Sequence, residues 1–275
     1  MHPRPNGMAE GNEDGVGATD ALSLRVSVAT LVRVLIASPK DGWPMLVLER
    51  TATLQAGEGG QEVSVVGKPF GGAVQIVDPS ALHEAIGDFH YDSERSRRER
   101  DFRLQVHPES WETVKWVCRT HLPSGGGSML DTSPDRELAE EFRDALGLTI
   151  GLGDYRSRLV DMLVDDAPRK TRSVRAPGRP TVRVYYIFEA WLDSPDLVSS
   201  ALESSGRTSD QDLRSAALRN AKDGGRGRAN AALVLGFDEL RAGYRDMMPA
   251  HPPGEPFRIG GHRFAGNVPL ILREG

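Results

Sequence analysis

The chain has 275 residues, enough for one large domain or two small ones, and 39% of them are apolar, which is adequate for a core. Its formal net charge of −5 at pH 7 excludes a global basic field that would attract nucleic acid or an anionic membrane, and its single cysteine, Cys118, excludes an internal disulfide and a cysteine zinc cluster. With no apolar run of membrane-spanning length and no signal peptide, the sequence predicts a soluble cytoplasmic protein without membrane or nucleic-acid partners, and leaves a homodimer open.

The first predicted elements are a polar tail and a hairpin. Residues 1–22 are rich in Gly, Asn, Asp, Glu and Pro, a composition that predicts a disordered tail. Residues 23–38 are dense in Val, Leu and Ile and predict a strand, and residues 45–50 predict a second strand after a turn centred on Asp41-Gly42. The polar, Gly-rich residues 51–62 are predicted to form a loop.

The next apolar stretch, residues 63–77, contains the segment Lys68-Pro-Phe-Gly-Gly72. Adjacent glycines let a backbone approach a metal ion or a phosphate closely, because no Cβ stands in the way. Gly71 and Gly72 are therefore candidate ligand contacts. The alternative interpretation of the pair is an ordinary bulge or turn.

The composition changes after Val77. Residues 78–132 predict a short helix at 82–86, a mixed charge run at 92–103, a strand at 102–106, an amphipathic helix at 110–122 and a Gly-rich connector at 124–128. Mixed charge runs are usually solvated surface, although these arginines could also face a substrate phosphate. If the segment is a surface excursion, a short linker in place of residues 80–128 should leave a cooperative fold.

Residues 133–147 predict a helix with its own start and stop. Ser133 can cap it, Pro134 would fall at the first helical position, and Gly147 suits the left-handed residue after the last turn. The helix carries acidic residues three or four positions apart, such as Glu137 and Glu141, and each such like-charge pair costs about 0.2–0.5 kcal/mol. A divalent cation would relieve that cost by binding the clustered carboxylates. The alternative is a solvated acidic face near a favourable helix N-terminus. The apolar stripe is Leu138, Phe142, Ala145 and Leu146, and the acidic face is Glu137, Glu140, Glu141 and Asp144.

The remaining chain alternates strands and helices. The clearest strand is 181–192, whose Glu189 is a candidate general base or a plain surface residue, and it follows a basic segment at 165–180 that is predicted to be a loop. The apolar residues 268–272 are expected to pack back onto the domain. Further strands are predicted at 157–164 and 231–235, and helices at 194–204, 209–222 and 237–247.

The segment Arg136-Glu-Leu-Ala-Glu-Glu141 resembles the helical half of the Nudix box, G-x5-E-x7-R-E-U-x-E-E-x-G-U, in which U is apolar. Lys68 to Gly72 resembles the strand-to-loop region that begins the box. The family's glycine after the glutamates falls at Arg143, and its upstream glutamate falls at Ser128. The resemblance thus implies an interrupted box, with an insertion at about 78–132.

This resemblance implies a Nudix-like α/β/α sandwich over residues 23–275, with a mixed sheet and an inserted α+β segment. It implies a metal-dependent hydrolase of a nucleoside diphosphate linked to another group. Glu137, Glu140 and Glu141 would hold Mg2+ or Mn2+. Arg136 would orient a glutamate, Gly71 or Gly72 would offer a backbone carbonyl, and Lys68 would neutralise phosphate charge. The alternatives are a catalytically inactive Nudix-like module that binds or senses a nucleotide, and a partner-binding protein.

Overall fold

The computed structural model describes residues 24–57, 60–121, 129–170, 178–225, 227–248 and 254–273. The predicted tail at 1–22 and the connector at 124–128 lie outside these ranges. No helix among the described residues is long and apolar enough to cross a membrane.

The centre of the molecule is the long strand β1 (Leu24–Ala37), which lies where the sequence predicts a strand. Its Val, Leu and Ile side chains are buried on both faces, as expected of a central strand. One edge pairs in parallel with β10 (Pro180–Leu192), which in turn pairs with the antiparallel β9 (Tyr155–Lys170). The other edge pairs successively with β7 (Arg103–Val106), β4 (Phe70–Ala73) and β2 (Pro44–Gly57).

The sheet continues beyond β2. Strand β2 pairs with β3 (Gly60–Lys68) and with β11 (Arg228–Gly236), and β3 leads to the small hairpin of β12 (Phe257–Ile259) and β13 (His262–Phe264). Parallel and antiparallel pairs occur together, so the predicted mixed sheet is confirmed.

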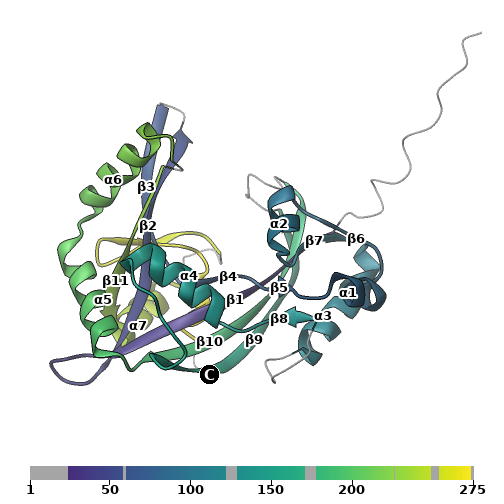
Figure 1. Cartoon of the computed structure of the whole chain (residues 1–275), viewed down its shortest axis with the longest axis horizontal. Helices are drawn as coiled ribbons and strands as arrows, with labels where there is room; N and C mark the ends of the chain where they lie inside the picture. Colours follow the sequence, from purple (N-terminus) through teal and green to yellow (C-terminus); the bar gives the residue numbers. More distant parts are fainter. Residues whose placement is uncertain are drawn as a thin grey trace, which may run out of the picture.

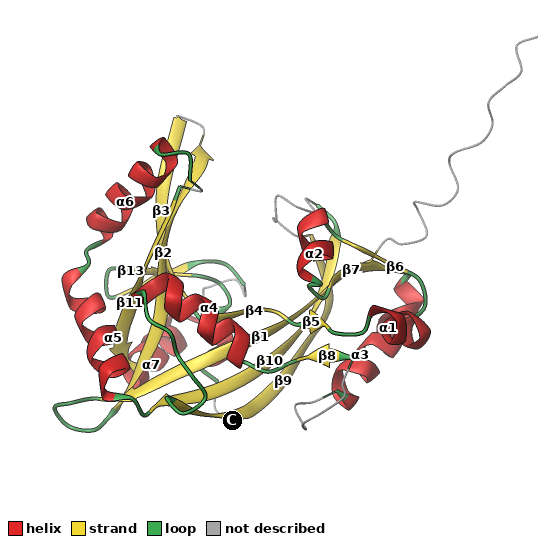
Figure 2. Ribbon diagram, in the orientation of Figure 1, coloured by secondary structure: helices red, strands yellow, loops and turns green. Residues whose placement is uncertain are grey.

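Helices cover both faces of this sheet (Figures 1 and 2). On one face, Val28 and Val32 share a core with α4 (Asp135–Leu146) and α5 (Pro195–Arg207). On the opposite face, Leu31 and Leu35 share a second core with α7 (Phe237–Met247) and α8 (Val268–Ile271), so residues 268–272 do pack back. The α/β class predicted from the alternation of elements is therefore confirmed.

The region predicted as a loop at 51–62 is instead part of a long β2–β3 hairpin, paired from Glu49↔Lys68 to Gly57↔Gly60. Ala52 and Val65 are buried beneath α6 (Asp210–Lys222), whose Leu213 completes this third cluster. The prediction was wrong because the strands gain their apolar cover from a distant helix, and not from a local run of large apolar residues.

The described residues of the predicted insertion form mixed α and β structure at the opposite end of the sheet from α6 (Figure 2). Strand β7 of this segment pairs directly with β1, and the buried ion pair between Arg25 and Asp92 (2.6 Å) ties the two parts together. Tyr186 of β10 also donates a 2.6 Å hydrogen bond to the carbonyl of Cys118. The segment thus shares the main core. Its other elements are α1 (Pro79–Ile86), β6 (Phe89–Tyr91), α2 (Glu94–Glu99), a 3-10 turn (Pro108–Ser110) and α3 (Trp111–Thr120), bracketed by the paired strands β5 (Gln75–Ile76) and β8 (Leu130–Asp131).

Candidate functional site

The glycine pair of β4 lies against the acidic helix α4, although the two segments are far apart in sequence (Figure 1). Gly71 pairs with Leu31 of β1 and has a φ of 138°, and a Cβ added to it would lie 2.1 Å from the Thr30 carbonyl oxygen. A Cβ on Gly72 would lie 2.1 Å from Oε2 of Glu137. Gly71 is required by its φ and by the backbone of β1, and Gly72 leaves the space that the Glu137 carboxylate occupies.

Helix α4 forms where the sequence predicts it, with one difference at its start. The first helical residue is Asp135, so Pro134 occupies the preceding cap position, while Ser133 Oγ accepts a hydrogen bond from the Asp135 N–H at 3.0 Å. Gly147 ends the helix in the left-handed conformation, with φ of 69°. Phe142 is fully buried and stacks on Phe70, with ring centroids 4.8 Å apart, which fixes the helix over β4.

Arg136 connects two glutamates of the helix to β4. Its guanidinium lies 2.5 Å from Oε1 of Glu137 and 3.6 Å from Oε1 of Glu140, and it donates a 2.8 Å hydrogen bond to the Ala73 carbonyl. Burial raises the pKa of Glu137, although Arg136 opposes the rise. Glu140 remains about half exposed. Arg136 therefore orients Glu137 against the strand.

Glu141 faces the other end of β4. Its Oε2 accepts a 2.6 Å hydrogen bond from the Gly71 N–H, and its Oε1 lies 2.8 Å from Nζ of Lys68. Burial raises the pKa of Glu141 to about 8, although Lys68 opposes the rise. Burial alone would lower the pKa of Lys68. The negative charges of Glu141 and of Glu49 on β2 outweigh burial, so the pKa of Lys68 is raised.

Glu49 is a member of this cluster that the sequence did not reveal. Its side chain is fully buried, with Oε2 2.6 Å from Lys68 Nζ and Oε1 2.8 Å from both Arg228 and the Thr51 hydroxyl. Burial would raise the pKa of Glu49, but Lys68 prevails and lowers it. Glu49 lies opposite Lys68 in the β2–β3 hairpin, and this pairing would have identified it. The prediction of a loop at 51–62 left the two strands unpaired, so the pairing was not seen.

Asp101 is a second acidic residue near the helix, which the sequence assigned only to the mixed charge run. It is buried beside Arg103, at 2.7 Å, and its charge raises the pKa of Glu137. Burial raises the pKa of Asp101 itself. Its place is fixed by a backbone bridge to Gln75, which the sequence pattern does not specify.

Several other candidates have structural partners elsewhere. Glu189 is held by Arg33 and Arg158, at 3.2 and 2.9 Å, on the α7 face of the sheet. In the charge run, Arg95 and Arg97 form short-range ion pairs with Glu99 and Glu94, as expected of solvated surface. The basic segment at 165–180 continues β9 as far as Lys170, and residues 171–177 lie outside the described part of the chain.

The structure thus brings together Lys68, Gly71, Gly72, Arg136, Glu137 and Glu141, with Glu140 at the edge. Carboxylate oxygens beside a backbone free of Cβ atoms suit a hard divalent cation. As the side chains lie, however, no three His, Cys, Asp or Glu residues among those described are grouped to hold a metal ion. Lys68 and Arg136 occupy the carboxylates in that arrangement.

Comparison of the chain with family models, curated proteins and solved structures finds no match. The functional argument therefore depends on the residues themselves.

Proposed function

We propose that this protein is a divalent-metal-dependent hydrolase of Nudix type, acting on a nucleoside diphosphate linked to another group. The observation that carries the proposal is the contact between β4 and α4. The Gly71 N–H donates a hydrogen bond to Glu141, and Gly72 leaves room for the Glu137 carboxylate. The two halves of the proposed Nudix box thus meet in space although a long segment separates them in sequence. The close fit of β4 between β1 and α4 gives a physical reason for a glycine at each of the two positions.

In this proposal Glu137, Glu140 and Glu141 hold Mg2+ or Mn2+, and Gly71 or Gly72 contributes a backbone carbonyl. The metal ion would polarise a phosphoryl oxygen and lower the pKa of the attacking water. Arg136 keeps Glu137 turned towards β4, as its 2.5 Å ion pair does in the structure. Lys68, at 28% side-chain exposure, would neutralise substrate phosphate charge beside Glu141.

The second candidate function is a Nudix-like module that binds or senses a nucleotide without hydrolysing it. The observation that favours it is the occupation of both Glu141 oxygens, one by Gly71 and one by Lys68. A site whose carboxylates are satisfied by the protein needs no metal ion to balance them.

Turnover separates the two. We expect the purified chain to hydrolyse at least one member of a panel of nucleoside diphosphate sugars and dinucleoside polyphosphates in Mg2+ or Mn2+, and to lose turnover in EDTA and in Glu140→Gln. Thermal stabilisation by a panel member without any turnover would favour the binding module instead.

A further inference from the structure

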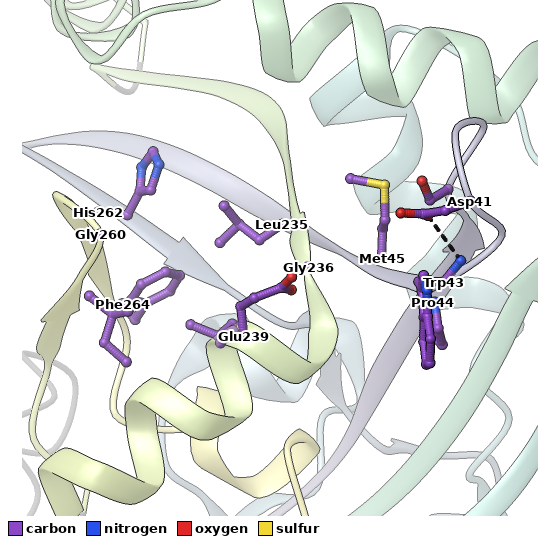
Figure 3. A pocket seen from close by; sticks show the side chains of 13 residues that line it. Asp41, Trp43, Pro44, Met45, Leu235, Gly236, Glu239, Gly260, His262 and Phe264 are labelled. Atoms are coloured by element: carbon purple, nitrogen blue, oxygen red, sulfur yellow. Dashed lines mark hydrogen bonds between the residues drawn. The ribbon is translucent and has the colours of Figure 1, made fainter.

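A groove on the α7 face of the sheet, away from α4, is formed by three segments that are distant in sequence (Figure 3). These are the turn between β1 and β2, the junction of β11 with α7, and the β12–β13 hairpin. Its volume is about 480 Å³, within the range of small-molecule sites. None of the residues proposed above to bind metal or substrate lines it.

The groove is acidic. Among the described residues that line it, Asp41 and Glu239 carry carboxylates, and none is a lysine or an arginine. The Glu239 carboxylate lies over the backbone of Gly236, where an added Cβ would be 1.5 Å from Oε2. Among the described residues, no hydrogen bond or ion pair engages the Glu239 side chain. Both carboxylates are exposed, so they are accessible to a ligand that enters the groove.

The groove also has aromatic walls. Trp43 is 66% exposed, so most of its indole is in contact with solvent in the described structure. Figure 3 shows Trp43 on one side of the groove, His262 and Phe264 on the other, and Glu239 between them. Asp41 is held near the tryptophan because its Oδ1 accepts a 3.3 Å hydrogen bond from the Trp43 N–H. Aromatic faces beside carboxylates are the surroundings that organic cations favour.

We propose that this groove binds a small organic cation with an apolar or aromatic body. Glu239 and Asp41 attract the positive head, and Trp43 offers its ring face to the head by a cation–π contact. Leu235 and Ile259, which are both partly exposed, cover the body. The same carboxylates repel phosphate groups, so the site is separate from the proposed hydrolytic centre and does not depend on it.

Calorimetry with the full chain at pH 8 tests the charge preference. The probe is benzyltrimethylammonium, with benzyl alcohol as the neutral control and phenylacetate as the anionic control. We expect one cation to bind per chain, more tightly than either control. Equal binding of the three probes, or no binding of the cation at concentrations up to about 10 mM, would overturn the proposal.

Matched variants place the probe in the groove. Glu239→Gln and Trp43→Leu should each weaken cation binding by about fivefold or more. The controls are Glu84→Gln, an exposed helical glutamate, and Trp116→Leu, whose tryptophan is 59% exposed outside the groove. The controls should bind as the wild type does, with thermal unfolding used to show that every variant is folded. Unchanged binding in Glu239→Gln, or an equal loss in Trp116→Leu, would refute the assignment.

Discussion

The backbone N–H of Gly71 donates a 2.6 Å hydrogen bond to Oε2 of Glu141, across 70 positions of sequence. This contact joins a short strand of the central sheet to the acidic helix. Since the neighbouring Gly72 also faces Glu137, two consecutive backbone positions each meet a different glutamate. Substitutions at the two glycines or the two glutamates should therefore disturb the contact between β4 and α4.

Gly72→Ala should displace Glu137, because the new Cβ would lie 2.1 Å from its carboxylate oxygen. We expect destabilisation by about 1–3 kcal/mol, as for other overpacked sites, together with loss of any hydrolytic activity. Urea unfolding measures the first effect. Gly153→Ala is the matched control, since nothing lies within 4 Å of its added Cβ. Equal stability of the two variants would show that the Glu137 carboxylate moves aside without cost and is not held in place against β4.

Lys68→Gln should destabilise the fold by about 1–3 kcal/mol, because the fully buried carboxylate of Glu49 loses the positive charge that lies 2.6 Å from its Oε2. It should also enlarge the rise in melting temperature produced by Mg2+, since the ammonium no longer competes for Glu141. Lys115→Gln is the control, because Lys115 bridges Glu112 and Asp166, which are both exposed. An Mg2+ response that is the same in both variants would show that Lys68 and the cation do not share a site.

Stability should depend on pH through Glu141, whose pKa burial raises to about 8 from an ordinary 4.5. The folded chain therefore holds this proton more tightly than the unfolded chain. The resulting stabilisation is fully present below about pH 4.5 and is lost as the pH rises towards 8. Urea titrations between about pH 5 and pH 8 should show a steeper fall for the wild type than for Glu141→Gln. Parallel profiles would contradict the raised pKa.

Replacing residues 80–128 by a short Gly/Ser linker tests whether the predicted insertion can be separated from the domain. Its sequence favours a surface excursion, but the replacement removes β7 from the edge of β1 and Asp92 from Arg25. It also removes the Cys118 carbonyl that Tyr186 bonds. We therefore expect the cooperative unfolding transition to be lost. A cooperative transition retained near the wild-type temperature would show that the segment is separable.

The sequence predicted those parts of the fold whose signal is local. Strand β1 is a continuous apolar run, and α4 combines a cap, an apolar stripe and Gly147, so both were found with small errors at the ends. The β2–β3 hairpin was missed because its apolar cover comes from α6. The approach of Gly71 to Glu141 was predicted only through the Nudix resemblance. Glu49 was missed because its role depends on strand register, which the sequence pattern does not specify.

The most direct test of the central claim is Mn2+ binding, measured by electron paramagnetic resonance on the full chain. Glu140→Gln with Glu141→Gln removes two proposed ligands, and Glu62→Gln with Glu84→Gln removes the same charge from exposed positions elsewhere. Our account predicts saturable binding in the wild type and the exposed-site control, and loss of that binding in the α4 variant. Unchanged Mn2+ binding in the α4 variant, or no binding by the wild type, would contradict a metal site at this helix.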